Sequence, residues 1–378
     1  MSTAFGGVSG AVRVSALLLV LSFFFAPAPD LAWRELDGVW IAMGTLAGLL
    51  VLGSVRSPAA LWVHLLQLIL LCVALHGVLG LVHADLLRGS AQLGFWLLVT
   101  SLAFAVWHVM QRFATSEPKG ALGLALYRVV VPGIFGAWFL AVWELVTVGF
   151  GVPQVLLPPP SLVGGAITES LGILAADFQQ TVVRAVIPGF VIGNLAGFAA
   201  ALAADRWAFL GRGLLPVGNL VSAIPIIGIA PIMVMWFGFD WQSKAAVVVI
   251  MSFFPMLVNT ISGLRSTGAI ELDLMRSIGA NHWQTFVRVR FPTALPFIFN
   301  ALKINSALAL IGAIVAEFFG TPIVGIGFRI STEVGRMNME MVWASIALAA
   351  VSGSVFYGLL AVAERRATFW HPSFRRLS

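Results

Sequence analysis

The 378-residue chain has few charged residues and a single cysteine. Charged side chains make up 10% of it, against roughly a quarter in a soluble domain, while 60% of its residues are hydrophobic and its mean hydropathy is +0.98. This composition excludes a water-soluble globular fold. With Cys72 alone, no intrachain disulfide is possible, and the redox compartment stays open.

The sequence also lacks the alternating polar and apolar strands of a transmembrane barrel. Apolar runs of about 20 residues recur instead, and a helix of that length crosses the roughly 30 Å hydrocarbon core. The first run is expected to be a retained span rather than a cleaved signal peptide. We predict an all-α integral membrane protein with about ten transmembrane helices, near residues 12–28, 38–54, 60–83, 92–112, 129–150, 180–204, 214–238, 245–263, 294–317 and 342–363.

Basic residues are distributed unevenly between the two sides of this topology. With the N-terminus inside, fifteen of the 22 Lys and Arg fall in cytoplasmic segments and five in outer loops. Lys and Arg concentrate in the cytoplasmic loops of membrane proteins. We therefore expect both termini in the cytoplasm, and the net charge of +6 is no sign of nucleic-acid binding.

Residues for ATP hydrolysis or metal binding are missing. A phosphate-binding loop needs Gly-Lys followed by Ser or Thr, whereas the three lysines precede Gly120, Ala245 and Ile304. The histidines of the first four predicted spans are not spaced as a compact ligand set, so no metal site is expected. No catalytic constellation is expected either.

A polar loop between two strongly apolar stretches is the most informative segment. Asp273 lies six residues before Gly279, while Val289 and Pro292 follow that glycine by ten and thirteen residues. This pattern resembles the coupling loop of binding-protein-dependent ABC importer permeases of type I. The family's loop opens with Glu-Ala-Ala, so the two large residues after Asp273 are a departure from it.

Other segments extend the resemblance over about two thirds of the chain. They include Trp236-Phe-Gly-Phe239 and Ala316-Glu-Phe-Phe-Gly320, and they are similar to the branch that serves nitrate, sulfonate, taurine and pyrimidine-type solutes. We predict three parts: an extra N-terminal four-helix membrane region at 1–114, a cytoplasmic linker at 115–124, and a six-helix permease core at 125–378 with its coupling loop at about 264–293.

The resemblance assigns the loop to contact with a separate ATPase. Gly279 suits a tight turn between two short helices, and Pro292 suits the start of the next span, where a missing N–H is tolerated. Two aromatic side chains are expected to anchor the loop in a pocket. The predicted coupling residues are Asp273, Arg276, Gly279, Ala280, Trp283, Phe286, Val289 and Pro292.

Polar residues and prolines within spans are candidates for the translocation pathway or a gate. A charge in hydrocarbon costs at least about 2.5 kcal/mol, so Glu317 either lines the pathway or belongs to a structural pair. Membrane amides bond between helices or line cavities, and prolines either break a span at a gate or kink it. The candidates are Glu317, Asn259, Asn305, Pro225 and Pro231.

The resemblance implies a permease subunit of the bacterial inner membrane that is not itself an enzyme. It implies two ABC ATPase subunits that bind ATP and Mg, a solute-binding protein, surrounding lipid, and a second permease copy, most simply a homodimer. The solute class remains open among sulfonate, nitrate, pyrimidine and vitamin precursor. The alternatives are an ion-gradient-driven transporter that titrates Glu317 or Glu144, and a membrane-embedded transferase.

Overall fold

The computed structural model describes residues 5–36, 38–54, 61–83, 87–115, 121–222, 224–320 and 323–370. Across these ranges the regular structure is helical and contains no strand, which confirms the predicted all-α class. The chain forms two compact units, residues 1–163 and 164–378. Of the linker predicted at 115–124, residues 116–120 lie outside the described residues. Compactness does not test where the permease core begins, so that boundary stays a prediction.

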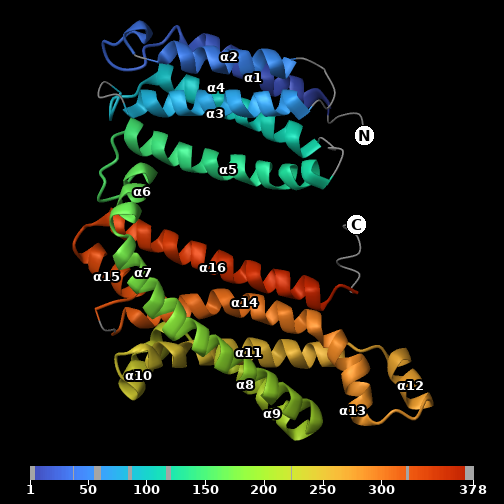
Figure 1. Cartoon of the computed structure of the whole chain (residues 1–378). Coiled ribbons are helices and arrows are strands. Elements are labelled where there is room, and N and C mark those ends of the chain that lie inside the picture. Colours follow the sequence, from blue (N-terminus) through green and yellow to red (C-terminus); the bar gives the residue numbers. More distant parts are fainter. Residues whose placement is uncertain are drawn as a thin grey trace. The chain divides into compact units, whose positions relative to one another are not determined.

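Unit 1 is a bundle whose helices bury one face around a shared core. α4 packs against all four of the other long helices, and Leu46, Leu98 and Leu102 are fully buried at the centre. Ser15 and Ser101 each donate a hydrogen bond to the other's carbonyl at 2.7 Å, which ties α1 to α4. The helices, blue to green in Figure 1, are α1 (Phe5–Ser22), η1 (Trp33–Glu35), α2 (Val39–Ser54), α3 (Leu61–His83), α4 (Leu93–Thr115) and α5 (Ala121–Gly149).

Unit 2 is built around one central helix, α11, which lies between α8 and α14. α16 packs on α14 and α15, and α10 packs on α11 and α14. After α6 (Pro160–Glu169), which begins before the unit boundary, come α7 (Leu171–Phe178), η2 (Gln179–Val186), α8 (Ile187–Arg206), α9 (Ala208–Ser222), α10 (Ile226–Phe237), α11 (Trp241–Arg265), α12 (Ala269–Ser277), α13 (His282–Thr285), η3 (Phe286–Arg290), α14 (Phe291–Glu317), α15 (Ile326–Gly335) and α16 (Met339–Ala367).

Small residues allow α8 to approach α11 closely. A methyl group added to Gly193 would lie 2.8 Å from the Val249 carbonyl oxygen, and one added to Gly189 would lie 2.6 Å from Val248. The glycines spaced by four residues therefore serve packing inside unit 2.

Seven helical segments of the described residues are long and apolar enough to cross a membrane. Three of the ten predicted spans correspond only to shorter apolar helices, namely Gly10–Ser22, Val39–Leu52 and Ile226–Phe237. The span predicted at 214–238 is divided into α9 and α10, because Pro225 has an extended backbone and caps α10. A multi-pass membrane protein is confirmed, while the number of ten spans is not.

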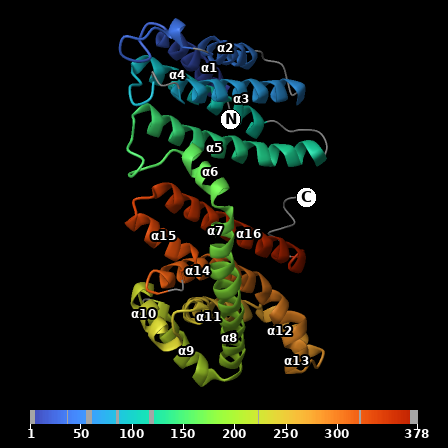
Figure 2. The ribbon, with the colours of Figure 1, turned by 60° about the vertical axis from the view of Figure 1, so that its left-hand side comes forward.

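Two long segments of unit 2 change their winding without ending. η2 is a π-helical stretch between α7 and α8, and Figure 2 shows these two helices in line. η3 is a second π-helical stretch that joins α13 to α14, so residues 282–317 form one continuous helical segment. π-helical turns are rare and occur often at functional sites.

Candidate functional site: a helical elbow that projects from unit 2

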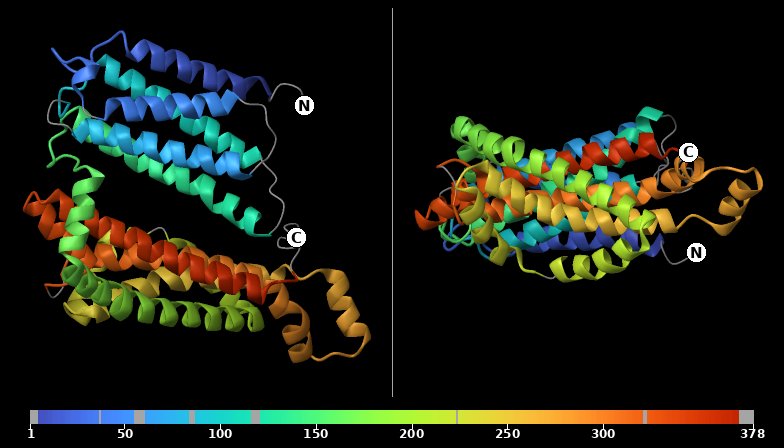
Figure 3. Two further views of the ribbon diagram at one scale, coloured as in Figure 1. Left: turned by 45° about the horizontal axis from the view of Figure 1, so that its top comes forward. Right: turned by 90° about the horizontal axis from the view of Figure 1, so that it is seen from below.

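The predicted coupling loop folds into two short helices, α12 and α13. Both project beyond the ends of α11 and α14, as Figure 1 and Figure 3 show in orange. We call residues 266–290 the elbow. The elbow brings together all the predicted coupling residues except Pro292, which lies in the first turn of α14.

Gly279 makes the turn of the elbow. Its φ of +68° lies in the left-handed region that favours glycine. The Gly279 N–H donates to the Arg276 carbonyl at 3.0 Å, and the Ala280 N–H donates to the Met275 carbonyl at 2.9 Å. These two bonds form the Schellman motif that ends a helix. A side chain on Gly279 would meet open space, so the glycine serves the backbone and not a close contact.

A capping box begins the second helix directly after this turn. The Gln284 N–H donates to Asn281 Oδ1 at 2.8 Å, and the Asn281 N–H donates to Gln284 Oε1 at 2.9 Å. Both bonds satisfy N–H groups that a helix start leaves open. Because both ends of the turn are closed by local hydrogen bonds, the angle between α12 and α13 is fixed by the elbow's own sequence.

The outer face of α12 carries an apolar stripe. Ile270, Leu274 and Ile278 are spaced by four residues, which places them on one face of a helix, and Ile270 is 84% exposed. Trp283 of α13 is also exposed. We call Ile270, Leu274 and Ile278 the apolar stripe. Exposed apolar side chains that form a contiguous patch on a polar segment mark interaction surfaces.

The predicted aromatic anchors lie together on the second arm of the elbow. The Trp283 and Phe286 rings stack with centroids 5.5 Å apart, and Phe286 also contacts Phe291. Both side chains line a cavity of about 330 Å³ beside Leu202 and Asp205 at the end of α8. The stacked pair thus packs partly on its own subunit, while the Trp283 side chain remains open to a partner.

An ion pair holds the base of the elbow to α8. Arg290 donates to both carboxylate oxygens of Asp205, at 2.7 and 2.8 Å, and to the Leu264 carbonyl at 3.3 Å. Such bidentate pairs are the stronger class of charged hydrogen bond. The contrasting pair, Arg276 with Asp273, is spaced by three residues on α12, and both side chains are largely exposed. Asp273 and Arg276 are therefore available at the surface.

Pro292 does not begin a new helix after a break. It lies in the first turn of α14, but η3 precedes α14 without interruption, and the Thr293 hydroxyl donates to the Val289 carbonyl at 2.8 Å. The wider π-helical winding accommodates the proline in a continuous segment. Pro292 therefore lies in the first turn of α14, as predicted, although the continuous helical segment already begins at His282. The arm of the elbow runs directly into the membrane helix.

The candidate pathway amides bond across helices of unit 2. Asn305 is fully buried and donates to Asn194 at 2.6 Å and to the Ser252 carbonyl at 2.8 Å, which joins α14 to α8 and α11. Asn300 lies 3.4 Å from Asn259 between the same α11 and α14. Pro225 lies at the break between α9 and α10, and Pro231 lies inside α10.

Glu317 has both carboxylate oxygens engaged at the end of α14. The Thr181 hydroxyl donates to Glu317 Oε1 and the Gly327 N–H donates to Oε2, both at 2.7 Å, and Glu317 is almost fully buried. Nearby, the Arg329 Nε lies 2.8 Å from Asp177, which also accepts from the Gly325 N–H at 2.8 Å. These bonds fasten the start of α15 to α7, η2 and α14.

Several of these partners were not recognised in the sequence. Asp205, Asp177 and Arg329 lie 85 to 152 residues from the groups they bond, so their roles depend on tertiary structure. The Asn281-x-x-Gln284 spacing is a local signal that was available. Glu144, a candidate titrating group of the alternative transporter, accepts from the Ser161 hydroxyl at 2.6 Å and lies 2.8 Å from His83.

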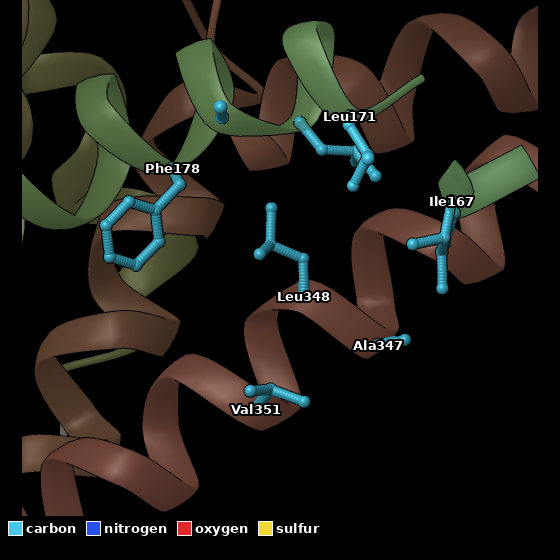
Figure 4. A pocket seen from close by; sticks show the side chains of 9 residues that line it. Ile167, Leu171, Phe178, Ala347, Leu348 and Val351 are labelled. Atoms are coloured by element: carbon cyan, nitrogen blue, oxygen red, sulfur yellow. The ribbon is translucent and has the colours of Figure 1, made fainter. Parts of the chain in front are cut away.

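An apolar cavity of about 380 Å³ lies between α6, α7 and α16 (Figure 4). The labelled side chains that surround it are Ile167, Leu171, Phe178, Ala347, Leu348 and Val351. These side chains carry no hydrogen-bonding group. The cavity is thus a poor candidate for binding a polar solute.

Comparison with known proteins identifies what this arrangement is similar to. The family model described as the binding-protein-dependent transport system inner membrane component matches residues 193–369, which lie wholly in unit 2.

Three curated relatives match over similar lengths. The riboflavin transport system permease protein of Chloroflexus aurantiacus is 32% identical over 62% of this chain and 87% of its own length. A probable ABC transporter permease protein of Haemophilus influenzae is 29% identical over 58% of this chain and 89% of its own. The taurine transport system permease protein of Escherichia coli is 26% identical over 62% and 87%.

Proposed function

Because the chain belongs to the family of binding-protein-dependent transport system inner membrane components, we propose that it is the permease subunit of an ATP-driven importer and that the elbow couples it to a separate ATPase. The relatives include permeases for small solutes and a probable ABC transporter permease. An ion-gradient-driven transporter is therefore not favoured.

The observation that carries this proposal is the apolar stripe on α12. Full burial of one aliphatic side chain contributes about 1.5–3 kcal/mol, and Ile270, Leu274 and Ile278 together offer three such side chains on one face. The helix that carries the stripe also holds Glu271, Asp273 and Arg276, and it projects from unit 2. A groove on an ATPase subunit that receives α12 would bury the stripe and leave Asp273 and Arg276 at its rim.

The connection from the elbow to the spans supports a mechanical role. The Schellman turn and the capping box fix the turn between α12 and α13, and α13 continues through η3 into α14. Arg290 joins the same base to α8 through Asp205. A displacement of α12 by the ATPase would therefore reach α14 and α8 together, the two helices that flank α11.

The remaining parts of the proposal are those that membership of the family implies. Two ATPase subunits bind ATP and Mg and hydrolyse the nucleotide, a solute-binding protein delivers the solute, and a second copy of this chain completes the pathway. The chain lies in the bacterial inner membrane with both termini in the cytoplasm. Asn259, Asn305 and Glu317 are proposed as pathway residues, with Pro225 and Pro231 at a gate.

The solute proposed is a small polar molecule of the sulfonate, nitrate, pyrimidine or vitamin-precursor class. The relatives named for riboflavin and taurine transport support this range. The four N-terminal helices lie outside the residues that the family model matches. They are proposed as an addition to the permease core.

The test compares two isoleucines of similar exposure. Ile270 in the stripe is 84% exposed, and Ile323 in the segment between α14 and α15 is 80% exposed. In Ile270→Asp we expect association with the ATPase to weaken at least tenfold, since about 1.4 kcal/mol corresponds to a factor of ten. Ile323→Asp is the matched control and should keep the affinity of the unsubstituted protein.

The amount of ATPase subunit that binds to the purified, detergent-solubilised permease is measured at increasing concentrations of that subunit. Insertion and monodispersity are checked for both variants by size-exclusion chromatography. Equal ATPase affinity of the two variants would contradict the assignment of α12 to the ATPase interface.

A further inference from the structure

The inner side of the elbow borders an open cavity of about 490 Å³ between the end of α11, α12 and α13. We call it the arginine cavity, because Arg265, Arg276 and Arg290 line it. His282, Thr267 and Thr285 add further polar groups, and no Asp or Glu is among the described residues that line it. It lies on the opposite side of α12 from the apolar stripe, facing the end of a membrane helix.

The three arginines differ in how far their charge is already neutralised. Arg290 is held by the two oxygens of Asp205, and it is about one fifth exposed. Arg276 pairs with Asp273 at 2.9 Å, but both side chains are largely exposed, and such pairs contribute only about 0–1 kcal/mol. Arg265 is exposed and forms no ion pair within the described part of the chain.

The cavity therefore holds the Arg265 guanidinium, which has no ion-pair partner among the described residues, and the Arg276 guanidinium, whose pair with Asp273 is largely exposed. A guanidinium is planar and binds phosphate oxygens through two parallel hydrogen bonds. The Asp205 carboxylate keeps Arg290 in place, so a bound anion would meet a positioned third guanidinium. Hydroxyl and imidazole groups at the wall supply further donors.

We propose that the arginine cavity binds a phosphate-type oxyanion through Arg265 and Arg276. Two sources have this chemistry: the headgroup of an anionic phospholipid, since Arg265 is the last residue of a membrane helix, and free inorganic phosphate. Either anion would bridge the end of α11 to α12 and stiffen the elbow from its inner side. The inference is separate from ATPase coupling, since it requires only the permease.

The experiment measures anion binding to the full-length permease purified in a neutral detergent. The first probe is phosphatidylglycerol, counted against phosphatidylcholine by native mass spectrometry. The second probe is inorganic phosphate, measured by titration calorimetry. We expect Arg265→Ala to weaken binding about tenfold or more, as the loss of a hydrogen-bonding partner of a charged group does. Arg276→Ala is a second variant and should change the affinity in the same direction.

Arg288→Ala is the matched control. Arg288 is an exposed arginine of the same elbow that is not among the residues lining the cavity, so its removal should leave the affinity unchanged. Phosphatidylglycerol binding without phosphate binding would assign the site to a lipid headgroup. Phosphate binding with the same dependence on Arg265 would assign it to the free ion.

Other outcomes overturn the proposal. They are an unchanged affinity in both Arg265→Ala and Arg276→Ala, an equal loss in Arg288→Ala, or no binding of either probe to the isolated permease. The last result would point to an acidic side chain of the ATPase as the partner of these arginines. Ile270→Asp should retain anion binding, which separates a failure of this proposal from a failure of the proposed coupling.

Discussion

Removal of the Asp205 charge is the most direct test of how the elbow is anchored. The Arg290 and Asp205 side chains are 18% and 13% exposed and share two hydrogen bonds of 2.7 and 2.8 Å. Breaking a fully buried pair costs about 3–5 kcal/mol, whereas an exposed pair is worth about 0–1 kcal/mol. Because this pair is mostly but not fully buried, we expect Asp205→Asn to lower the free energy of unfolding by about 2 kcal/mol.

The chain offers a control of the same chemistry in the same elbow. The Asp273 and Arg276 side chains are 69% and 79% exposed, so Asp273→Asn should lower the free energy of unfolding by less than about 0.5 kcal/mol. Stability is measured by denaturation of the purified permease, and a double-mutant cycle with Arg290→Gln isolates the pair. We expect a coupling energy of about 1–3 kcal/mol for Asp205 with Arg290.

A functional measurement accompanies the stability measurement. If Arg290 and Asp205 transmit the movement of the elbow to α8, Asp205→Asn in proteoliposomes should hydrolyse more ATP for each solute taken up. The reasoning would be refuted if Asp205→Asn and Asp273→Asn were equally stable, or if the effects of Asp205→Asn and Arg290→Gln simply added.

Two further predictions concern glycines. In Gly325→Ala the new methyl group would lie 2.7 Å from the Glu317 carboxyl at a φ of +142°, so we expect a loss of about 1–3 kcal/mol in thermal denaturation. Gly335→Ala, where nothing lies within 4 Å, should be near neutral by the same measurement. In Gly193→Leu the side chain would collide with the Val249 backbone, and we expect little monodisperse protein by size-exclusion chromatography. Gly133→Leu, at an open position of α5, should behave as the unsubstituted protein does.

Much of the fold was predictable because lipid imposes one requirement on every span. A run of apolar residues must satisfy its backbone internally, so helices near 60–83, 92–112 and 342–363 follow from hydropathy alone. The number of spans was less predictable. Hydropathy continues across Pro225, while the backbone of that residue is extended and divides the predicted span into α9 and α10.

In the elbow, too, features set by neighbouring residues were predictable, whereas contacts between residues far apart in the sequence were not. Gly279 was predicted to form a turn, and its positive φ confirms that role. The ATPase contacts of the eight coupling residues stay predictions. The anchoring of Arg290 by Asp205 was not predictable, because the two residues are 85 positions apart and no local pattern joins them. Pro292 lies in the first turn of α14 as predicted, whereas the π-helical stretch before it leaves no clear signature in the sequence and was not predictable.

The π-helical stretch η2 also decides which side chains of its segment face inward. It points Thr181 towards Glu317, while Asp177, one turn earlier, meets Arg329. A π turn accommodates about one residue more than an α turn. If η2 rewound as α-helix with all of its residues kept, the extra residue would rotate α7 by about 100° relative to α8. Asp177 would then turn away from Arg329, so the length of this stretch sets the alignment of the end of unit 2 where α15 begins.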